Sequence, residues 1–361
     1  MQIGALELKN FRCFPVLELE INAPLVLISG TNGSGKTSLL EALHYACYLR
    51  SFRTHVPREL LLFDQSTFFI KLAMRSAQFE HELQVGFSAK KKLVKIDHQP
   101  INSYKELIDY YRTITLTEDD LLLIKGGPDG RRLFIDQAIM LHDPQFVVQL
   151  RTLKNYVQQR TALLNRTHTI VDDSYVFWTQ QLFEQSQLVQ QKRIPLLLNL
   201  ENRVNQLLES FNSGATIQLR YHAKKSISDS TWPDWFAQYE HQLPTQEYIL
   251  KRSLFGAHVD DVEIYFKGHQ AKNFASRGQQ KLILMLLKLA QLQELKALKG
   301  DALLLLDDFM NDFDKPTAQR LIGLIKELCC QVIFTCPLEV GYSEQLLMEQ
   351  GCQKIELKDR Q

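Results

Sequence analysis

A glycine-rich stretch near the start of the chain restricts the possible folds more than any other feature. Residues 30–37 read GTNGSGKT; they follow the apolar run 25–28 and precede a helix-forming segment over residues 38–49. A strand, the pattern G-x-x-x-x-G-K-T and a helix together make a phosphate-binding loop, in which backbone N–H groups converge on the β-phosphate at the positive end of the helix. The stretch predicts an α/β fold that binds ATP or GTP, and a chance glycine loop is the alternative.

Single residues of this loop have distinct expected roles. The Lys36 ammonium supplies positive charge to the β- and γ-phosphates, and the Thr37 hydroxyl is placed to bind Mg²⁺. The glycines let the backbone come close to the phosphates. The expected nucleotide-binding residues of the loop are Gly30, Asn32, Gly33, Ser34, Gly35, Lys36, Thr37 and Ser38.

The composition is that of a globular protein and gives no overall charge argument for a partner. Hydrophobic residues make up 45% of the chain, and 42 Lys and Arg residues balance 41 Asp and Glu residues. Any contact with nucleic acid must therefore come from a local patch, although each basic cluster also fits a solvated edge or turn. The basic clusters are Lys90, Lys91, Lys92 and Lys95; Arg50, Arg53 and Arg58; and Lys224 with Lys225.

Cysteine spacing and the absence of an apolar leader indicate a cytoplasmic protein. The 6 cysteines contain no C-x-x-C pair, which predicts reduced thiols and argues against a zinc site. The N-terminus runs directly into an alternating strand pattern. The most apolar long segment, residues 282–292, contains Lys288 and is too short to span a bilayer. We therefore expect a soluble protein without a membrane partner.

Hydrophobic periodicity changes twice along the chain. Up to about residue 100, alternation over residues 17–21 and 79–87 predicts strands, and Ser103 with Glu106 forms a capping-box pattern for a helix. From about 115 to 250 the period is helical. Asp143-Pro144 fits a helix start there, and a second helical tract over residues 175–211 is expected to break at Pro195.

Strand patterns return near the C-terminal end, at residues 262–266, before a long helix over about 277–298. The pattern therefore indicates one α/β lobe built from residues 1–112 and 253–361. A compact helical lobe is expected as an insertion at residues 113–252, with helices too interrupted for a long coiled coil.

Two buried strands in the last part of the chain end at polar side chains. Four leucines at 303–306 precede Asp307 and Asp308, and residues 332–334 precede Thr335. Acids directly after an apolar run favour a parallel strand that ends at a site over a helix core. Asp307 would hold Mg²⁺, through a water, and Asp308 would orient or deprotonate the attacking water. Capping of a turn is the alternative for these acids.

The segment 276–281, SRGQQK, opens the long apolar helix. A serine at a helix N-terminus beside a glycine presents a hydroxyl and free N–H groups to an anion. One chain cannot easily bring this segment and the phosphate loop to the same phosphate. We therefore expect Ser276, Gly278 and Gln279 to contact ATP held by a second, head-to-tail copy, although a plain helix cap also fits Ser276.

Together these motifs resemble the ABC-type ATPase heads of the SMC class, and the whole chain is similar to the RecF family of bacterial recombination-repair ATPases. The shared motifs follow the family's order over residues 1 to about 340. They are residues 8–12 (LKNFR), 30–37, 51–54 (SFRT), 118–121 (EDDL) with 125–126, 131–136 (RRLFID), 256–258 with 260–261, 278–281 (GQQK) and 304–308 (LLLDD).

The resemblance implies an ABC-type P-loop ATPase lobe with a mixed sheet and an inserted, mainly helical second lobe. It implies a weak, DNA-dependent ATPase that forms a homodimer on ATP, binds duplex DNA and ss/ds junctions at gaps and stalled forks, and uses slow hydrolysis as a release timer. With RecO and RecR, such a protein promotes RecA loading. Lys92, Lys95, Arg131 and Arg132 are the candidate contacts to the duplex. By position, Lys36 and Thr37 are the phosphate and Mg²⁺ residues, Asp307 and Asp308 the Walker B acids, and Ser276 the trans contact to the γ-phosphate.

Several positions depart from the family's pattern. Arg277 adds a cation beside the proposed trans phosphate, and Val259 replaces an arginine. Thr335 occupies the place where a switch histidine would be sought, and no Q-loop glutamine is evident. Arg53 either reaches a phosphate or braces the loop after the first helix. These departures bear on hydrolysis and partner contacts rather than on ATP binding.

Other functions fit this set of motifs less well. A transporter motor would need a surface that couples to a membrane subunit and a Glu after the Walker B Asp, where this chain has Asp308. An overcoming-lysogenization nuclease would need a nuclease domain, and too few residues follow Thr335 to form one. A non-enzymatic scaffold is harder to separate, because the position of the catalytic water depends on Asp308 alone.

Overall fold

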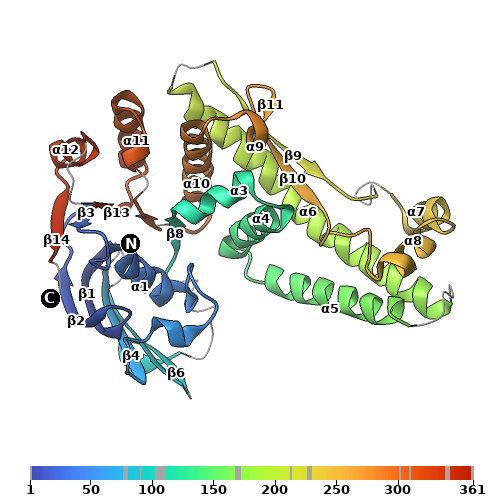
Figure 1. Ribbon diagram of the computed structural model, residues 1–361, viewed down its shortest axis with the longest axis horizontal. Coiled ribbons are helices and arrows are strands. Elements are labelled where there is room, and N and C mark those ends of the chain that lie inside the picture. The colour runs from blue at the N-terminus through green and yellow to red at the C-terminus, as the bar shows by residue number, and fades with distance from the viewer. Residues whose placement is uncertain are drawn as a thin grey trace. The chain divides into compact units, whose positions relative to one another are not determined.

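The chain forms two compact units in the computed structural model, which Figure 1 shows as a ribbon. Unit 1 is Met1–Asp120 with Leu284–Gln361, and unit 2 is Leu121–Ile283. The structure describes residues 2–75, 80–89, 91–101, 107, 111–166, 172–211, 214–225, 230–300, 302–308, 310–337 and 342–358.

An antiparallel sheet forms one layer of unit 1. Its strand order is β2 (Phe14–Glu20), β1 (Gln2–Phe11), β4 (Thr67–Arg75), β5 (Glu80–Ser88), β6 (Lys92–Ile96) and β7 (Gln99–Pro100). Alternate residues such as Leu6 and Leu8 are buried while their neighbours are not, as expected for a sheet with one face on the core. The predicted strands at 17–21 and 79–87 are confirmed as β2 and β5; Phe79 and the capping-box pair at 103 and 106 lie outside the described residues.

A parallel sheet forms the second layer of unit 1. Its strand order is β14 (Gln353–Leu357), β3 (Leu25–Gly30), β13 (Gln331–Pro337), β12 (Leu303–Leu306) and β8 (Thr113–Leu116). All four strand pairs are parallel, and β3 and β12 are buried along their whole length. The α/β fold class is confirmed, with the parallel and antiparallel strands in separate sheets.

Helix α1 (Lys36–Tyr48) lies between the two sheets, because it contacts β4 and β5 of one and β3, β8 and β13 of the other. This position explains why nearly every residue of α1 is buried. Further helical segments in the described part of unit 1 are the 3-10 turns Pro57–Leu60, Glu118–Leu121 (its last residue in unit 2) and Met310–Asp312, the helices α11 (Lys315–Glu327) and α12 (Tyr342–Glu349), and most of α10 (Arg277–Lys299).

Unit 2 combines helices with a small antiparallel sheet of order β11 (His269–Gln270), β10 (Asp261–Phe266) and β9 (Ile217–His222). Helix α5 packs along α6, as Figure 1 shows. The helices among the described residues of this unit are α3 (Leu122–Lys125), α4 (Pro128–His142), α5 (Phe146–Leu164), α6 (Asp173–Glu209), α7 (Trp232–Tyr239), α8 (Leu243–Leu250), α9 (Ala271–Phe274) and the first residues of α10. None of the helices in the described parts of the chain is long and apolar enough to cross a membrane.

Two expectations about the helices of unit 2 are wrong in detail. Helix α6 continues for 37 residues through Pro195 instead of breaking there. Pro195 is exposed, and the buried neighbours Arg193 and Leu196 hold the helix against the rest of unit 2. Helix α5 begins at Phe146 rather than at Asp143; the Asp143 carboxylate accepts the Gln145 N–H at 3.2 Å in the turn before it.

The units also divide the chain at different residues from those expected. The sequence placed the inserted lobe at 113–252, whereas unit 2 covers Leu121–Ile283. Strand β8 belongs to unit 1 because it pairs with β12, and β10 belongs to unit 2 because it pairs with β9. Periodicity along the chain cannot reveal such partners.

Buried charges connect the helices of unit 2. Arg160 of α5 is 1% exposed and donates to Glu247 of α8, to Thr179 of α6 and to Ser253. Arg193 of α6 similarly donates two hydrogen bonds, of 2.8 and 2.9 Å, to Asp136 of α4. Removing one partner of such a pair leaves a buried charge uncompensated, so these pairs fix how the helices meet.

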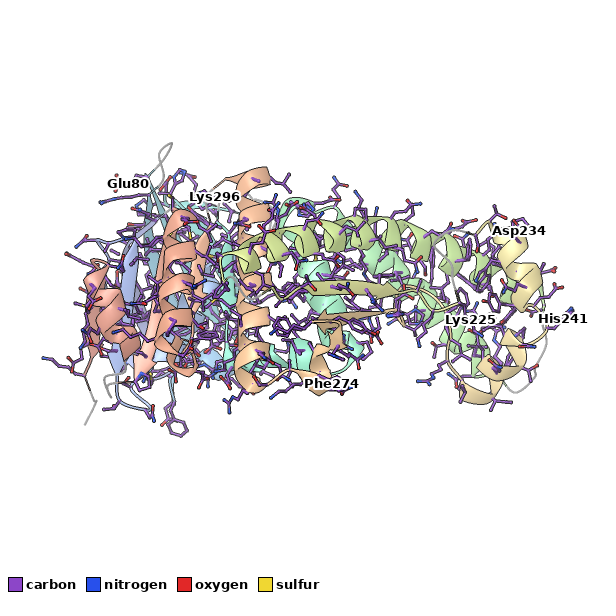
Figure 2. The ribbon with its side chains drawn as sticks, turned by 90° about the horizontal axis from the view of Figure 1, so that it is seen from above. Glu80, Lys225, Asp234, His241, Phe274 and Lys296 are labelled. Atoms are coloured by element: carbon purple, nitrogen blue, oxygen red, sulfur yellow. The ribbon has the colours of Figure 1, made fainter. Side chains whose placement is uncertain are left out.

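Aromatic side chains fill the end of unit 2 where Lys225, Asp234 and His241 lie in Figure 2. The Trp235 ring centroid lies 4.6 Å from that of Phe255, and the Trp235 indole N–H donates to the Lys225 carbonyl at 2.8 Å. This cluster holds α7 against the rest of the unit.

Candidate nucleotide site

The glycine-rich loop joins β3 to α1 in a conformation that requires its glycines. Gly33 and Gly35 have φ values of 89° and 100°, which side-chain-bearing residues rarely adopt. A Cβ on Gly35 would lie 2.6 Å from Phe14 Cζ and 2.7 Å from Cys13 Sγ, and one on Gly30 would collide with Ser34 Oγ. A Cβ on Gly33 would meet nothing within 4 Å, because this part of the loop faces open space.

Polar groups of the loop gather where a phosphate would be held. The buried Lys36 donates from Nζ to the carbonyls of Gly30 and Thr31, both at 2.8 Å. Ser34 Oγ is buried and has no hydrogen-bond partner among the described residues. Asn32 is exposed, and Ser38 is buried in the first turn of α1. A cation, an unpaired hydroxyl and a glycine backbone at a helix N-terminus fit the phosphates of a nucleotide.

Thr37 and Asp307 meet at this loop although 270 residues separate them in the chain. The Thr37 hydroxyl donates to Asp307 Oδ1 at 3.0 Å, and the Thr335 hydroxyl donates to the same oxygen at 2.8 Å. The strand order brings them together, because β13 lies between β3 and β12. A carboxylate beside a threonine hydroxyl is the oxygen set that Mg²⁺ takes in P-loop ATPases, so these residues fit the metal.

Burial raises the pKa of Asp307, and the hydrogen bonds from Thr335 and Thr37 oppose this rise. The nearby charge of Asp308 raises the same pKa, whereas that of Arg53 lowers it. A divalent cation bound here would favour the ionised carboxylate.

Asp308 follows in an unusual backbone conformation. Its φ is 47°, in the left-handed region, and its side chain is exposed. Its N–H donates to Thr335 Oγ1 at 2.9 Å. Asp adopts left-handed φ values more readily than most side-chain-bearing residues, so an aspartate fits this position.

Sequence reasoning missed a buried carboxylate in the helix that follows the loop. Glu41 of α1 is fully buried and accepts two hydrogen bonds of 2.8 Å from Arg12. It also accepts from the Ser51 hydroxyl, and Arg53 lies 3.6 Å away. Arg53 therefore braces the segment after α1, and its charge also acts on Asp307. The sequence signal that could have revealed Glu41 is its position as the single acidic residue in the otherwise apolar run 39–43.

The predicted trans residues lie in unit 2, whereas the loop and the acids lie in unit 1. Ser276 and Gln279 cap α10 reciprocally: the Ser276 N–H donates to Gln279 Oε1 at 2.9 Å, and the Gln279 N–H donates to Ser276 Oγ at 3.3 Å. This is a capping box. Ser276 and Gly278 are exposed, so the capped helix end is open to a ligand.

Two of the predicted DNA-binding residues have acidic partners inside unit 2. Arg131 donates two hydrogen bonds, of 2.8 and 2.9 Å, to Asp261, and Arg132 pairs with Asp129. Lys92 donates to the Leu49 carbonyl at 3.4 Å, and partial burial lowers its pKa. Arg131 and Arg132 are therefore poorly available for phosphates; Lys90 lies outside the described residues.

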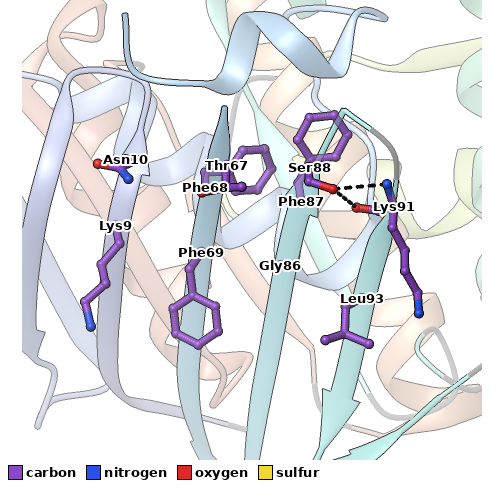
Figure 3. A pocket seen from close by; sticks show the side chains of 10 residues that line it. All are labelled: Lys9, Asn10, Thr67, Phe68, Phe69, Gly86, Phe87, Ser88, Lys91 and Leu93. Carbon is purple, nitrogen blue, oxygen red and sulfur yellow. Dashed lines mark hydrogen bonds between the residues drawn. The ribbon is translucent and has the colours of Figure 1, made fainter. Parts of the chain in front are cut away.

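The outer face of the antiparallel sheet carries an open depression (Figure 3). Lys9 and Lys91 lie on either side of Phe69, Gly86 and Leu93. The Lys91 side chain makes no ion pair with a described residue, whereas Lys9 pairs with Glu7 at 2.6 Å. Lys95 is level with Gln84 on the neighbouring strand.

Comparisons with protein-family models and with known sequences both find relatives of this chain. The family described as AAA domain matches residues 5–315. A DNA replication and repair protein RecF from Streptococcus pyogenes is 30% identical over 345 residues, which are 94% of this chain and 93% of that protein. One from Acholeplasma laidlawii is 29% identical over 314 residues, 86% and 87% of the two chains.

Solved structures share the fold. The recombination mediator protein RecF bound to ATP, from the RecFOR pathway, matches with a TM-score of 0.80 and 25% identity over 94% of this chain and 93% of that chain. An Smc head bound to the C-winged helix domain of ScpA matches with a TM-score of 0.54 and 14% identity, over 93% and 90% of the two chains. The second likeness concerns the fold alone.

Proposed function

The chain belongs to the RecF family of ATP-binding DNA replication and repair proteins, and we propose that it acts as an ATP-gated DNA clamp in recombinational repair. In this proposal ATP closes a homodimer, and the dimer binds duplex DNA or ss/ds junctions near gaps and stalled forks. It promotes RecA loading with RecO and RecR in the cytoplasm. The meeting of Thr37 with Asp307 supports the ATP-dependent step most directly.

In this proposal, side chains of the loop and the two acids have the roles in ATP hydrolysis. Lys36, at the end of the loop, holds the β- and γ-phosphates. Thr37 and Asp307 would hold Mg²⁺, and the ion would supply positive charge to the phosphates. Asp308 orients the attacking water, and a short carboxylate on a strained backbone fits slow turnover. Asp308→Asn should abolish turnover while ATP binding persists; unchanged turnover would remove Asp308 from this role.

Dimerisation is proposed to use the exposed, capped end of α10. Ser276, Gly278 and Gln279 would meet the γ-phosphate of ATP held by the second copy, since an exposed helix N-terminus favours an anion. Ser276→Arg should therefore bind ATP as a monomer and fail to dimerise. Asn273→Arg, at an exposed position of α9, is the matched control and should dimerise normally. Light scattering with ATP distinguishes the two, and a dimeric Ser276→Arg variant would contradict the trans contact.

The central experiment is duplex-DNA binding measured by fluorescence anisotropy with ATP, with ADP and without nucleotide at one low salt concentration. Tight binding only with ATP is expected, because the two-lobed clamp needs the closed dimer. Lys36→Met should lose nucleotide binding, dimerisation and DNA binding together. Equal binding in all three nucleotide states would contradict the ATP-gated clamp.

The DNA contact itself is proposed for the lysines of the antiparallel sheet, since Arg131 and Arg132 have partners in unit 2. Replacing Lys91 and Lys95 with Gln should weaken binding and lower the slope of log K against log salt by about 0.9 for each phosphate that is no longer neutralised. Lys315→Gln, at an exposed position of α11, is the control. An unchanged slope in the double variant would exclude this face.

A further inference from the structure

The Thr335 hydroxyl lies between the two acids that follow β12. Phe334 of β13 pairs with Leu306 of β12, so Thr335 is level with Asp307 where two adjacent parallel strands end. Thr335 Oγ1 donates to Asp307 Oδ1 at 2.8 Å and accepts the Asp308 N–H at 2.9 Å. Its side chain is buried, at 4% exposure, so water does not readily replace either bond.

One hydroxyl therefore uses its proton on one acid and a lone pair on the backbone of the next. The bond to the Asp308 N–H matters because that residue has a φ of 47°. A non-glycine residue returns to negative φ unless its surroundings hold it, and such a return would redirect its side chain.

We propose that Thr335 is a positioning residue for ATP hydrolysis, whose hydroxyl holds Asp308 in its left-handed conformation and Asp307 beside Thr37. This inference depends on the roles of Asp307 and Asp308 in the proposed function. Thr335 couples the acid that holds the metal to the acid that orients the water, and it does so without touching the phosphates. The position of a switch histidine is thus taken by a group that acts on the acids.

The structure separates the two threonines that donate to Asp307. Thr37 lies in the phosphate loop, so its hydroxyl serves binding of Mg²⁺-ATP as well as Asp307. Thr335 lies on β13 and contacts only the acids among these groups in the described structure. Loss of the Thr37 hydroxyl should therefore weaken binding, whereas loss of the Thr335 hydroxyl should slow the chemical step.

The test compares Thr335→Val, which keeps the shape and removes the hydroxyl, with Thr335→Ser, which keeps the hydroxyl. Single-turnover ATP hydrolysis, ATP affinity and melting temperature are measured on the full chain with duplex DNA. We expect Thr335→Val to hydrolyse ATP about 10–100-fold more slowly, the usual cost of losing a group that orients a metal ligand, with ATP affinity unchanged. Serine should recover most of the rate, and less than all because its χ1 is freer than that of threonine.

Thr115→Val is the matched control. Thr115 is buried in β8 and its hydroxyl bonds to His44 Nδ1 at 2.8 Å, away from the acids. It should lower the melting temperature and leave the hydrolysis rate unchanged. If Thr335→Val does not fold, Thr335→Ala tests the same hydroxyl with less bulk.

Three results would overturn the inference: a wild-type rate in Thr335→Val, a loss of ATP affinity that matches the loss of rate, or no recovery in Thr335→Ser. Asp308→Asn, measured alongside, distinguishes failure of the positioning role of Thr335 from failure of the catalytic role of Asp308. If Asp308→Asn is slow and Thr335→Val is normal, only the positioning role fails. If Asp308→Asn is normal, the proposed catalytic role fails and the positioning role fails with it.

Discussion

The two left-handed glycines of the phosphate loop should respond differently to the same substitution. Gly35→Ala places a Cβ 2.6 Å from Phe14 Cζ and 2.7 Å from Cys13 Sγ in a backbone with φ of 100°. Gly33→Ala has a similar φ, 89°, and no atom within 4 Å. Comparing the two variants therefore separates the cost of backbone strain from the cost of a steric collision.

The expected magnitudes follow from these two effects. A left-handed conformation costs a side-chain-bearing residue about 1–2 kcal/mol. Overpacking against a buried neighbour adds about 1–3 kcal/mol. Gly33→Ala should thus destabilise unit 1 by about 1–2 kcal/mol, and Gly35→Ala by about 2–5 kcal/mol. Phe14→Leu, which shortens the side chain that the Cβ would meet, should recover part of the loss in Gly35→Ala.

The assay must report on unit 1, and tryptophan fluorescence does not, because Trp178, Trp232 and Trp235 all lie in unit 2. Hydrogen exchange of the α1 amides measures the opening free energy of the helix that follows the loop. Tryptophan fluorescence then serves as a control for unit 2. An equal loss in the two alanine variants, or none in Gly35→Ala, would refute the packing argument.

Three further changes test other parts of the fold. Arg160→Met leaves the buried Glu247 carboxylate without its cation, and tryptophan fluorescence should show unit 2 destabilised by about 3–5 kcal/mol. Burial lowers the pKa of His44 to about 3 from 6.5, so the folded state binds fewer protons than the unfolded state between these pH values. The free energy of unfolding should therefore fall as pH drops from 6.5 towards 3, by up to about 1.4 kcal/mol per pH unit. His44→Gln should reduce this pH dependence in urea titrations. Pro195→Ala should stabilise α6 by up to about 3 kcal/mol, and an unchanged melting temperature would contradict this.

Local patterns predicted the strand, loop and helix of residues 25–48 and several other strands. The strand, glycines and helix of residues 25–48 are contiguous, so a short stretch of sequence specifies this strand–loop–helix unit. Errors appeared where a distant partner decides the outcome. Pro195 was expected to end a helix, but the buried flanking residues Arg193 and Leu196 hold α6 together. Arg131 was expected on DNA, but Asp261 lies 130 positions away in sequence and beside it in space.

The sequence by itself determined that this chain holds a glycine-rich loop between a strand and a helix, two acids after a buried strand and a capped helix, because each is a short run of residues. Only the tertiary structure decided which side chains act together. β13 lies between β3 and β12, so Thr335 reaches Asp307 and Asp308, and Thr37 meets Asp307. Strand order depends on hydrogen bonds and packing between segments far apart in the chain, and no local pattern encodes it.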